Sequence, residues 1–167
     1  FDAYKFEKCE NFYNKALDIC RRLNQKNPNL YKSQLSEILI SLGNLYTRTG
    51  QFSKGDFIYK EALEICQDLS SQNPEKYEHK LAVSWANLGY FYGEGQQLEE
   101  SEEAFLNALK IYQRLSVKNP EVYEPELAKI YYNLAHGYSH TQRDDQAEVI
   151  YQNYIQIYFR LCAQNRA

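Results

Sequence analysis

An asparagine–proline pair recurs at a fixed interval and constrains the fold of this chain more than any other feature. The pairs begin at Asn27, Asn73 and Asn119, each 46 residues after the last, and a tyrosine follows each proline by three positions. Aligned without a gap, residues 28–73 and 74–119 are identical at 14 of 46 positions. Fixed periods of about 20 to 50 residues are typical of stacked units that cannot bury their apolar faces alone. The sequence therefore predicts a repeat array.

Apolar residues within each 46-residue unit recur at steps of three and four, in two blocks. In the central unit the first block contains Trp85, Leu88 and Tyr92, and the second contains Phe105 and Leu109. This spacing predicts two antiparallel amphipathic helices of about 16–20 residues each. Glycine and polar residues separate the two helices. Proline cannot continue a helix but suits its first position, so the asparagine–proline pairs separate the units.

The period divides the chain into parts of one array over residues 1–167. Residues 1–27 align with the second half of a unit, so we expect them to form the second helix of a truncated repeat. Residues 28–73, 74–119 and 120–167 are predicted to be repeats one, two and three.

The two ends of the chain carry further expectations. The chain begins in the middle of a repeat at Phe1 and contains no methionine, so we expect it to be a fragment. We expect the array to end with repeat three, because Tyr154 occupies a close-packing position. In addition, Asn165-Arg166 stands where the next asparagine–proline pair would fall.

Composition excludes several classes of partner. Hydrophobic residues make up 44% of the chain and charged residues 25%, and no run approaches the roughly 18 apolar residues of a membrane helix, so no membrane partner is expected. The net charge is −3 without a basic stripe, which argues against a nucleic-acid partner. The four cysteines include no Cys-x-x-Cys pair, which favours free thiols and a cytoplasmic location.

A longer motif in the central unit identifies a family resemblance. The unit contains, in order, Trp85-x-x-Leu88-Gly89-x-x-Tyr92 and Phe105-x-x-Ala108. This pattern resembles the tetratricopeptide repeat. The usual unit of that family has about 34 residues, so the 46-residue period looks like the long-repeat variety of kinesin light chains and bacterial arrays. The resemblance implies an all-α fold, a right-handed α–α superhelix of antiparallel helix pairs.

One face of the first helices is predicted to be the binding surface. At 3.6 residues per turn, Trp85 and Leu88 point to the core, whereas Asn87 and Tyr90 lie nearly opposite. The resemblance implies that this face lines a concave groove that holds extended peptides of a protein partner. The groove candidates from the three repeats are Asn44, Arg48, Asn87, Tyr90, Lys129, Tyr132, Asn133 and His136.

Asparagines at one position of the period indicate how a peptide could be held. Asn87 and Asn133 are equivalent, and an amide offers both a donor and an acceptor to the backbone of an extended segment. The alternative is that these amides bond to neighbouring helices. The family also has a carboxylate clamp for chain termini, but only Asn44 and Lys129 match it, so we do not expect an acidic chaperone tail to bind.

The sequence contains no constellation that predicts catalysis. No nucleophile with a positioned base can be recognised, so we expect no enzyme and no catalytic residue. His136 and His140 are four residues apart, as in some metal sites, but no third ligand is evident, and neither a metal nor another cofactor is expected. Gly93-Glu94-Gly95 is not a phosphate loop, because no strand precedes it.

The last predicted helix is more apolar than one neighbouring helix requires. Its interface candidates are Tyr151, Tyr154, Tyr158 and Phe159. Such a patch tends to mark an interface, so homodimerisation through this helix is a second hypothesis. The sequence as a whole predicts a protein–protein interaction scaffold. The alternative function is an oligomerisation or sensor module, with a regulatory role, in a larger signalling protein.

Overall fold

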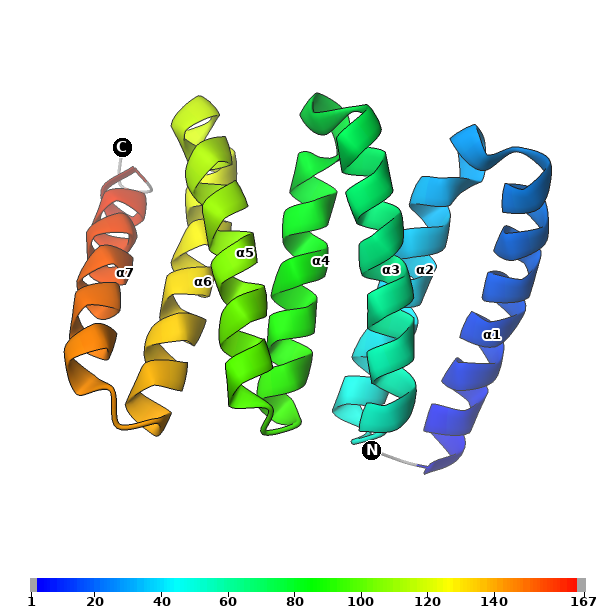
Figure 1. Cartoon of the computed structure of the whole chain (residues 1–167), viewed down its shortest axis with the longest axis horizontal. Coiled ribbons are helices and arrows are strands. Elements are labelled where there is room, and N and C mark those ends of the chain that lie inside the picture. The colour runs from blue at the N-terminus through cyan, green and yellow to red at the C-terminus, as the bar shows by residue number, and fades with distance from the viewer. Residues whose placement is uncertain (1–2, 165–167) are drawn as a thin grey trace.

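The computed structural model describes residues 3–164 and forms them into seven helices (Figure 1). They are α1 (Ala3–Lys26), α2 (Pro28–Arg48), α3 (Phe52–Gln72), α4 (Pro74–Glu94), α5 (Leu98–Lys118), α6 (Pro120–His140) and α7 (Asp144–Gln164). The all-α fold of antiparallel helix pairs predicted from the sequence is confirmed. The expectation for Asn165-Arg166 lies outside the described residues. None of the described helices combines the length and the apolar character that crossing a membrane requires.

The helices are longer than predicted. α2 to α7 each contain 21 residues and α1 contains 24, against an expected 16–20. The reason lies at the junctions between repeats, where a single non-helical asparagine separates two helices. Asn27, Asn73 and Asn119 play this part, and a proline at the first position of the next helix follows each of them. Proline suits that position because its missing N–H would have no partner there.

Helices that are neighbours in the chain pack against each other in sequence order across the stack (Figure 1). In addition, α2 contacts α4 and α4 contacts α6, whereas no contact joins α3 to α5 or α5 to α7 among the described residues. Elements on the inner side of a curved stack come closest together, and that side forms the concave surface of repeat arrays. We conclude that α2, α4 and α6 lie on the inner side.

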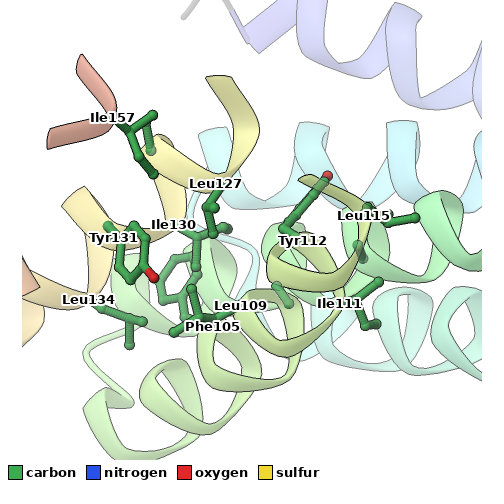
Figure 2. Close-up of a cluster of buried hydrophobic side chains, with 13 residues drawn as sticks. Phe105, Leu109, Ile111, Tyr112, Leu115, Leu127, Ile130, Tyr131, Leu134 and Ile157 are labelled. Atoms are coloured by element: carbon green, nitrogen blue, oxygen red, sulfur yellow. The ribbon is translucent and has the colours of Figure 1, made fainter. Parts of the chain in front are cut away.

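The core consists of apolar clusters that each span consecutive helices. The cluster between α5, α6 and α7 contains Tyr112, Ile130 and Ile157, all nearly inaccessible to solvent (Figure 2). One comparable cluster extends over α1, α2 and α3, and another extends over α3, α4 and α5. The apolar faces of the helices inside the stack are therefore buried by neighbouring helices, as a stacked array requires.

Three glycines inside helices, Gly43, Gly55 and Gly89, allow an aromatic ring of the next helix to approach the backbone. A Cβ atom at Gly43 would lie 2.8 Å from the ring of Tyr59, and one at Gly89 would lie 2.9 Å from the ring of Phe105. A glycine within a helix costs about 1 kcal/mol relative to alanine. The prediction that Gly43 and Gly89 admit a neighbouring helix is confirmed.

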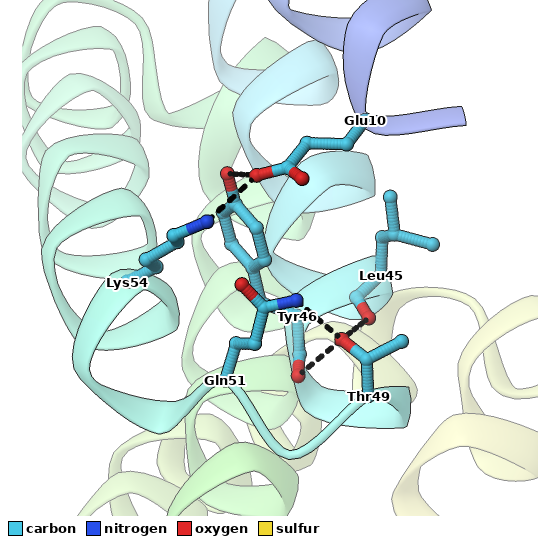
Figure 3. A network of polar contacts seen from close by, with 6 residues as sticks. All are labelled: Glu10, Leu45, Tyr46, Thr49, Gln51 and Lys54. Atoms are coloured by element: carbon cyan, nitrogen blue, oxygen red, sulfur yellow. Dashed lines mark hydrogen bonds and ion pairs between the residues drawn. The ribbon is translucent and has the colours of Figure 1, made fainter. Parts of the chain in front are cut away.

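A tyrosine–carboxylate hydrogen bond repeats between α1 and α2 and between α3 and α4. The Tyr46 hydroxyl donates to Glu10 Oε1 over 2.8 Å, and the Tyr92 hydroxyl donates to Asp56 Oδ1 over 3.0 Å. Lys54 also bonds Glu10, over 3.0 Å (Figure 3). Burial alone would raise the pKa of Glu10, but the bonds from Lys54 and Tyr46 outweigh it and lower that pKa. The ionised carboxylate therefore holds α1, α2 and the start of α3 together.

The glycine contacts yield a prediction for stability. Gly43→Ala should lower the free energy of unfolding by about 1 kcal/mol, because overpacking of about 1–3 kcal/mol exceeds the gain in helix propensity. The Tyr59 ring is fully buried and cannot move aside easily. Gly137→Ala is the matched control, because a Cβ at Gly137 meets nothing within 4 Å, and it should raise stability. Urea unfolding measures both variants, and a Gly43→Ala protein as stable as the control would contradict the explanation.

Candidate partner-binding surface

The predicted groove residues lie on the three inner helices. Asn44 and Arg48 lie on α2, Asn87 and Tyr90 on α4, and the remaining four, Lys129, Tyr132, Asn133 and His136, on α6. We call these eight residues the polar row. Asn87 and Asn133 are half-buried, and the other six are exposed. Arg48 takes part in an interaction within the chain.

Asn44 is bound to its own scaffold. The hydroxyl of the buried Tyr59 donates to Asn44 Oδ1 over 2.6 Å and lies 3.2 Å from Thr47 Oγ1. Burial raises the pKa of Tyr59 to about 12, so this hydroxyl remains a donor at neutral pH. The side-chain oxygen of Asn44 therefore satisfies a buried polar group. Asn44 therefore bonds to a neighbouring helix, which is the alternative that the sequence left open for the asparagines.

The two equivalent asparagines differ in their bonds. The Asn87 side-chain amide donates to the carbonyl oxygen of Val83, one turn earlier in α4, over 2.9 Å. The Asn133 side chain makes no hydrogen bond within the part of the chain that the structure describes. Asn133 thus keeps both its donors and its acceptor for another molecule, and Asn87 keeps its side-chain oxygen.

Aromatic rings connect the polar row to the last helix. The rings of Tyr132 and His136 are stacked with centroids 6.2 Å apart, and the ring centroids of His136 and His140 are 4.5 Å apart. The Tyr132 ring also contacts Tyr154 of α7, with ring centroids 5.8 Å apart. The ring centroids of Tyr154 and Tyr158 are 6.0 Å apart. The α6 part of the predicted groove and the predicted α7 interface are therefore one continuous aromatic surface.

The outer face of α7 is not covered by a following helix in the described structure, whereas the equivalent faces of α3 and α5 are covered. Ala62, Leu63 and Cys66 of α3 are buried, and the positions two periods later are Tyr154, Ile155 and Tyr158. Ile155 is 45% exposed and Tyr158 is 52% exposed. Phe159 beside them is 69% exposed, whereas Tyr151 is half-buried. Three of the four predicted interface residues are therefore within an aromatic patch that α7 presents at least in part to solvent.

A small recess lies between α5 and α6, next to Asn133. It is lined by Leu98, Ser101, Glu102, Phe105, Asn133, Leu134, Gly137, Tyr138 and Arg143. Asn133 is the one lining residue that the sequence predicted to be a site residue. The signal was present in the repeat alignment, because Gly137 occupies the position of Leu45 and Phe91.

Arg143 and Glu102 close the polar side of this recess as an ion pair. Arg143 Nη2 donates to Glu102 Oε2 over 2.6 Å, and the guanidinium lies over the Tyr138 ring. The hydrogen bond to Glu102 raises the pKa of Arg143, so the arginine stays charged. Burial, and then the bond to Glu102, raise the pKa of Tyr138. The charges at the recess are thus mutually compensated.

Stacked helix pairs with a polar inner row define a helical repeat protein. Two segments, residues 36–69 and 82–114, match the family described as tetratricopeptide repeat. These two segments of the chain are tetratricopeptide repeats. Repeats of this family form protein-interaction scaffolds.

One solved structure of another protein supports the repeat superhelix. The chain is similar to BtubC (BKLC) from P. vanneervenii, with 26% sequence identity and a TM-score of 0.72. That match covers 93% of this chain and 58% of BtubC, so the chain spans a little over half of that protein. MamA from Desulfovibrio magneticus RS-1 aligns with 16% identity and a TM-score of 0.40, over 90% of this chain and 96% of the MamA chain. No curated protein sequence matches the chain.

Proposed function

We propose that the chain holds an extended segment of a protein partner along the inner face of α2, α4 and α6. The observation that carries this proposal is the amide of Asn133, which is half-buried, uncommitted and flanked by exposed Tyr132 and His136. A side-chain amide can pair with the N–H and C=O groups of an extended backbone. Asn87 contributes its free oxygen one period earlier. Tyr90 and Lys129 complete the contact surface.

The charge of this face favours a partner segment without strong net charge. The inner face includes Glu37 and Glu94 as well as Arg48 and Lys129, so its formal charges cancel. Lys129 also pairs with Glu126 over 2.7 Å on the surface of α6. Exposed pairs of this kind contribute only about 0–1 kcal/mol. Recognition would therefore depend on hydrogen bonds and ring contacts more than on ionic attraction.

The asparagines provide the test of this proposal. Peptides selected from a random display library against the protein should bind the Asn87→Ala/Asn133→Ala variant at least tenfold more weakly, which corresponds to about 1.4 kcal/mol. The melting temperature should stay nearly unchanged, because neither amide bonds to another helix. Fluorescence anisotropy and thermal unfolding measure the two quantities.

Asn44→Ala is the contrasting variant. It removes the acceptor of the Tyr59 hydroxyl and should lower stability by about 1 kcal/mol. If the double variant instead loses stability and keeps its affinity for peptides, the asparagines are structural and the proposal is wrong.

The exposed face of α7 supports a second candidate function, self-association. Its aromatic patch, Tyr154, Tyr158 and Phe159, occupies the face that a following helix covers in α3 and α5. A second copy would supply the missing cover and make the chain an oligomerisation module. The regulatory alternative, a module within a larger signalling protein, rests on the same face.

Light scattering tests self-association directly. The protein should show the mass of a dimer at high concentration, and Tyr158→Ser/Phe159→Ser should show the mass of one chain. Both side chains are about half exposed or more, so the variant should remain folded. A wild-type protein with the mass of one chain at every concentration would exclude the homodimer.

A further inference from the structure

Gly137 is a helical glycine that no packing contact or turn explains. A Cβ atom there meets nothing within 4 Å, whereas one at Gly55 would lie 2.5 Å from the Phe91 ring. Its φ is not in the left-handed region, which among the glycines is reached at Gly50 alone within residues 3–164. Glycine within a helix costs up to about 1 kcal/mol relative to alanine. The fold therefore gains nothing from the missing side chain at this position.

The equivalent positions in the preceding repeats are filled. Leu45 of α2 and Phe91 of α4 are both buried, and Phe91 packs against the rings of Phe52 and Tyr59. Each of these side chains enters the space between its helix and the preceding one. The same space between α5 and α6 receives no side chain from Gly137, and the recess beside Asn133 is the result.

The walls of the recess suit an apolar side chain. Leu98, Phe105 and Leu134 supply its apolar lining, and Phe105 and Leu134 face the same region in Figure 2. Burial of an aliphatic side chain there would be favourable, because it removes apolar surface from water. The charged groups at its edge are paired with each other, as described for Arg143 and Glu102.

The polar groups at the recess leave one free hydrogen-bonding site. The Ser101 hydroxyl donates to the carbonyl oxygen of Gly89 over 2.8 Å, so it is already engaged. The amide of Asn133 is the uncommitted group. A peptide backbone bonded to Asn133 would therefore pass directly over the opening.

The size of the recess follows from comparison with the two filled positions. Phe91 faces Gly55. Leu45 belongs to the cluster of α1, α2 and α3, against which Cys9, the equivalent of Gly55, packs. Ser101 occupies this position in α5, and a Cβ at the equivalent Gly55 would lie 2.5 Å from the Phe91 ring, so a phenylalanine-sized side chain has less room beside Ser101. The recess thus resembles the site of Leu45 more than the site of Phe91.

We propose that the recess at Gly137 binds a leucine-sized aliphatic side chain of the partner segment, in the place that Leu45 fills in repeat one. This proposal rests on the proposed peptide-binding function and names the side chain that the peptide presents. Asn133 positions the backbone on either side of that residue.

The test uses two capped pentapeptides, one with leucine between pairs of serines and one with alanine in place of the leucine. In ¹⁵N NMR titrations the leucine peptide should cause saturable shifts of the Leu98, Ser101 and Gly137 amides. The alanine peptide should bind at least tenfold more weakly. Equal binding of the two peptides would overturn the proposal, and so would shifts confined to other regions. It would also be overturned if the leucine peptide caused no shift at about 10 mM, a concentration at which a dissociation constant of that size corresponds to a binding free energy of about 2.7 kcal/mol.

A variant that fills the recess provides the control. Gly137→Leu should raise the melting temperature and weaken binding of the leucine peptide at least tenfold. If this variant fails to fold, Gly137→Ala, whose Cβ meets no atom within 4 Å, replaces it and should weaken binding several-fold. Unchanged binding by the folded variant would overturn the proposal.

The two proposals can fail separately. If both peptides bind equally and Asn133→Ala weakens both, the groove remains and the recess proposal is wrong. If the leucine peptide binds the Asn87→Ala/Asn133→Ala variant with unchanged affinity at the Leu98 and Ser101 amides, the recess is supported and the backbone-pairing proposal is wrong.

Discussion

Aromatic rings that pack directly on glycine backbone determine how closely the helices of this chain approach. Tyr59 lies against Gly43, Phe105 against Gly89 and Phe91 against Gly55, each at a distance that leaves no room for a Cβ atom. Packed interiors transmit such local changes because they contain few voids. The spacing of α2 to α5 therefore depends on these three pairs. The tyrosine–carboxylate bonds at Glu10 and Asp56 then fix the orientation of one pair to the next.

The same repeat that makes the array regular also makes its exceptions informative. Positions 45, 91 and 137 are equivalent, but the first two fill an inter-helix space and the third leaves it open. The opening adjoins Asn133, the asparagine of the polar row whose side chain makes no hydrogen bond in the described chain. Tyr132, whose ring contacts Tyr154 of α7, lies on the same helix, α6. The features proposed for partner binding thus concentrate at α6, where the repeat departs most from its own pattern.

The period of 46 residues made the fold predictable, because it identified helix pairs, their junctions and the glycines at Gly43 and Gly89. Helix lengths were underestimated, since proline placed directly after a single asparagine lets the helices extend to the junction. The bond from Tyr59 to Asn44 was not predictable, because two helix faces must be placed before a hydroxyl can be assigned to an amide. The recess at Gly137 arises from a missing side chain and its neighbours on α5, so the residue alone did not indicate it.

A double-mutant cycle on Gly55 and Phe91 tests the dependence of the fold on glycine–aromatic packing most directly. The account predicts that Gly55→Ala strongly destabilises the wild-type protein but costs at least about 1 kcal/mol less in a Phe91→Leu background, since contacting residues couple by about 0.5–3 kcal/mol. One period earlier the equivalent residues are Cys9 and Leu45, and Cys9 packs against the cluster that contains Leu45. The chain therefore already combines a side chain at the glycine position with leucine at the phenylalanine position. Effects that add within about 0.5 kcal/mol would show that the two residues are independent and would contradict the account.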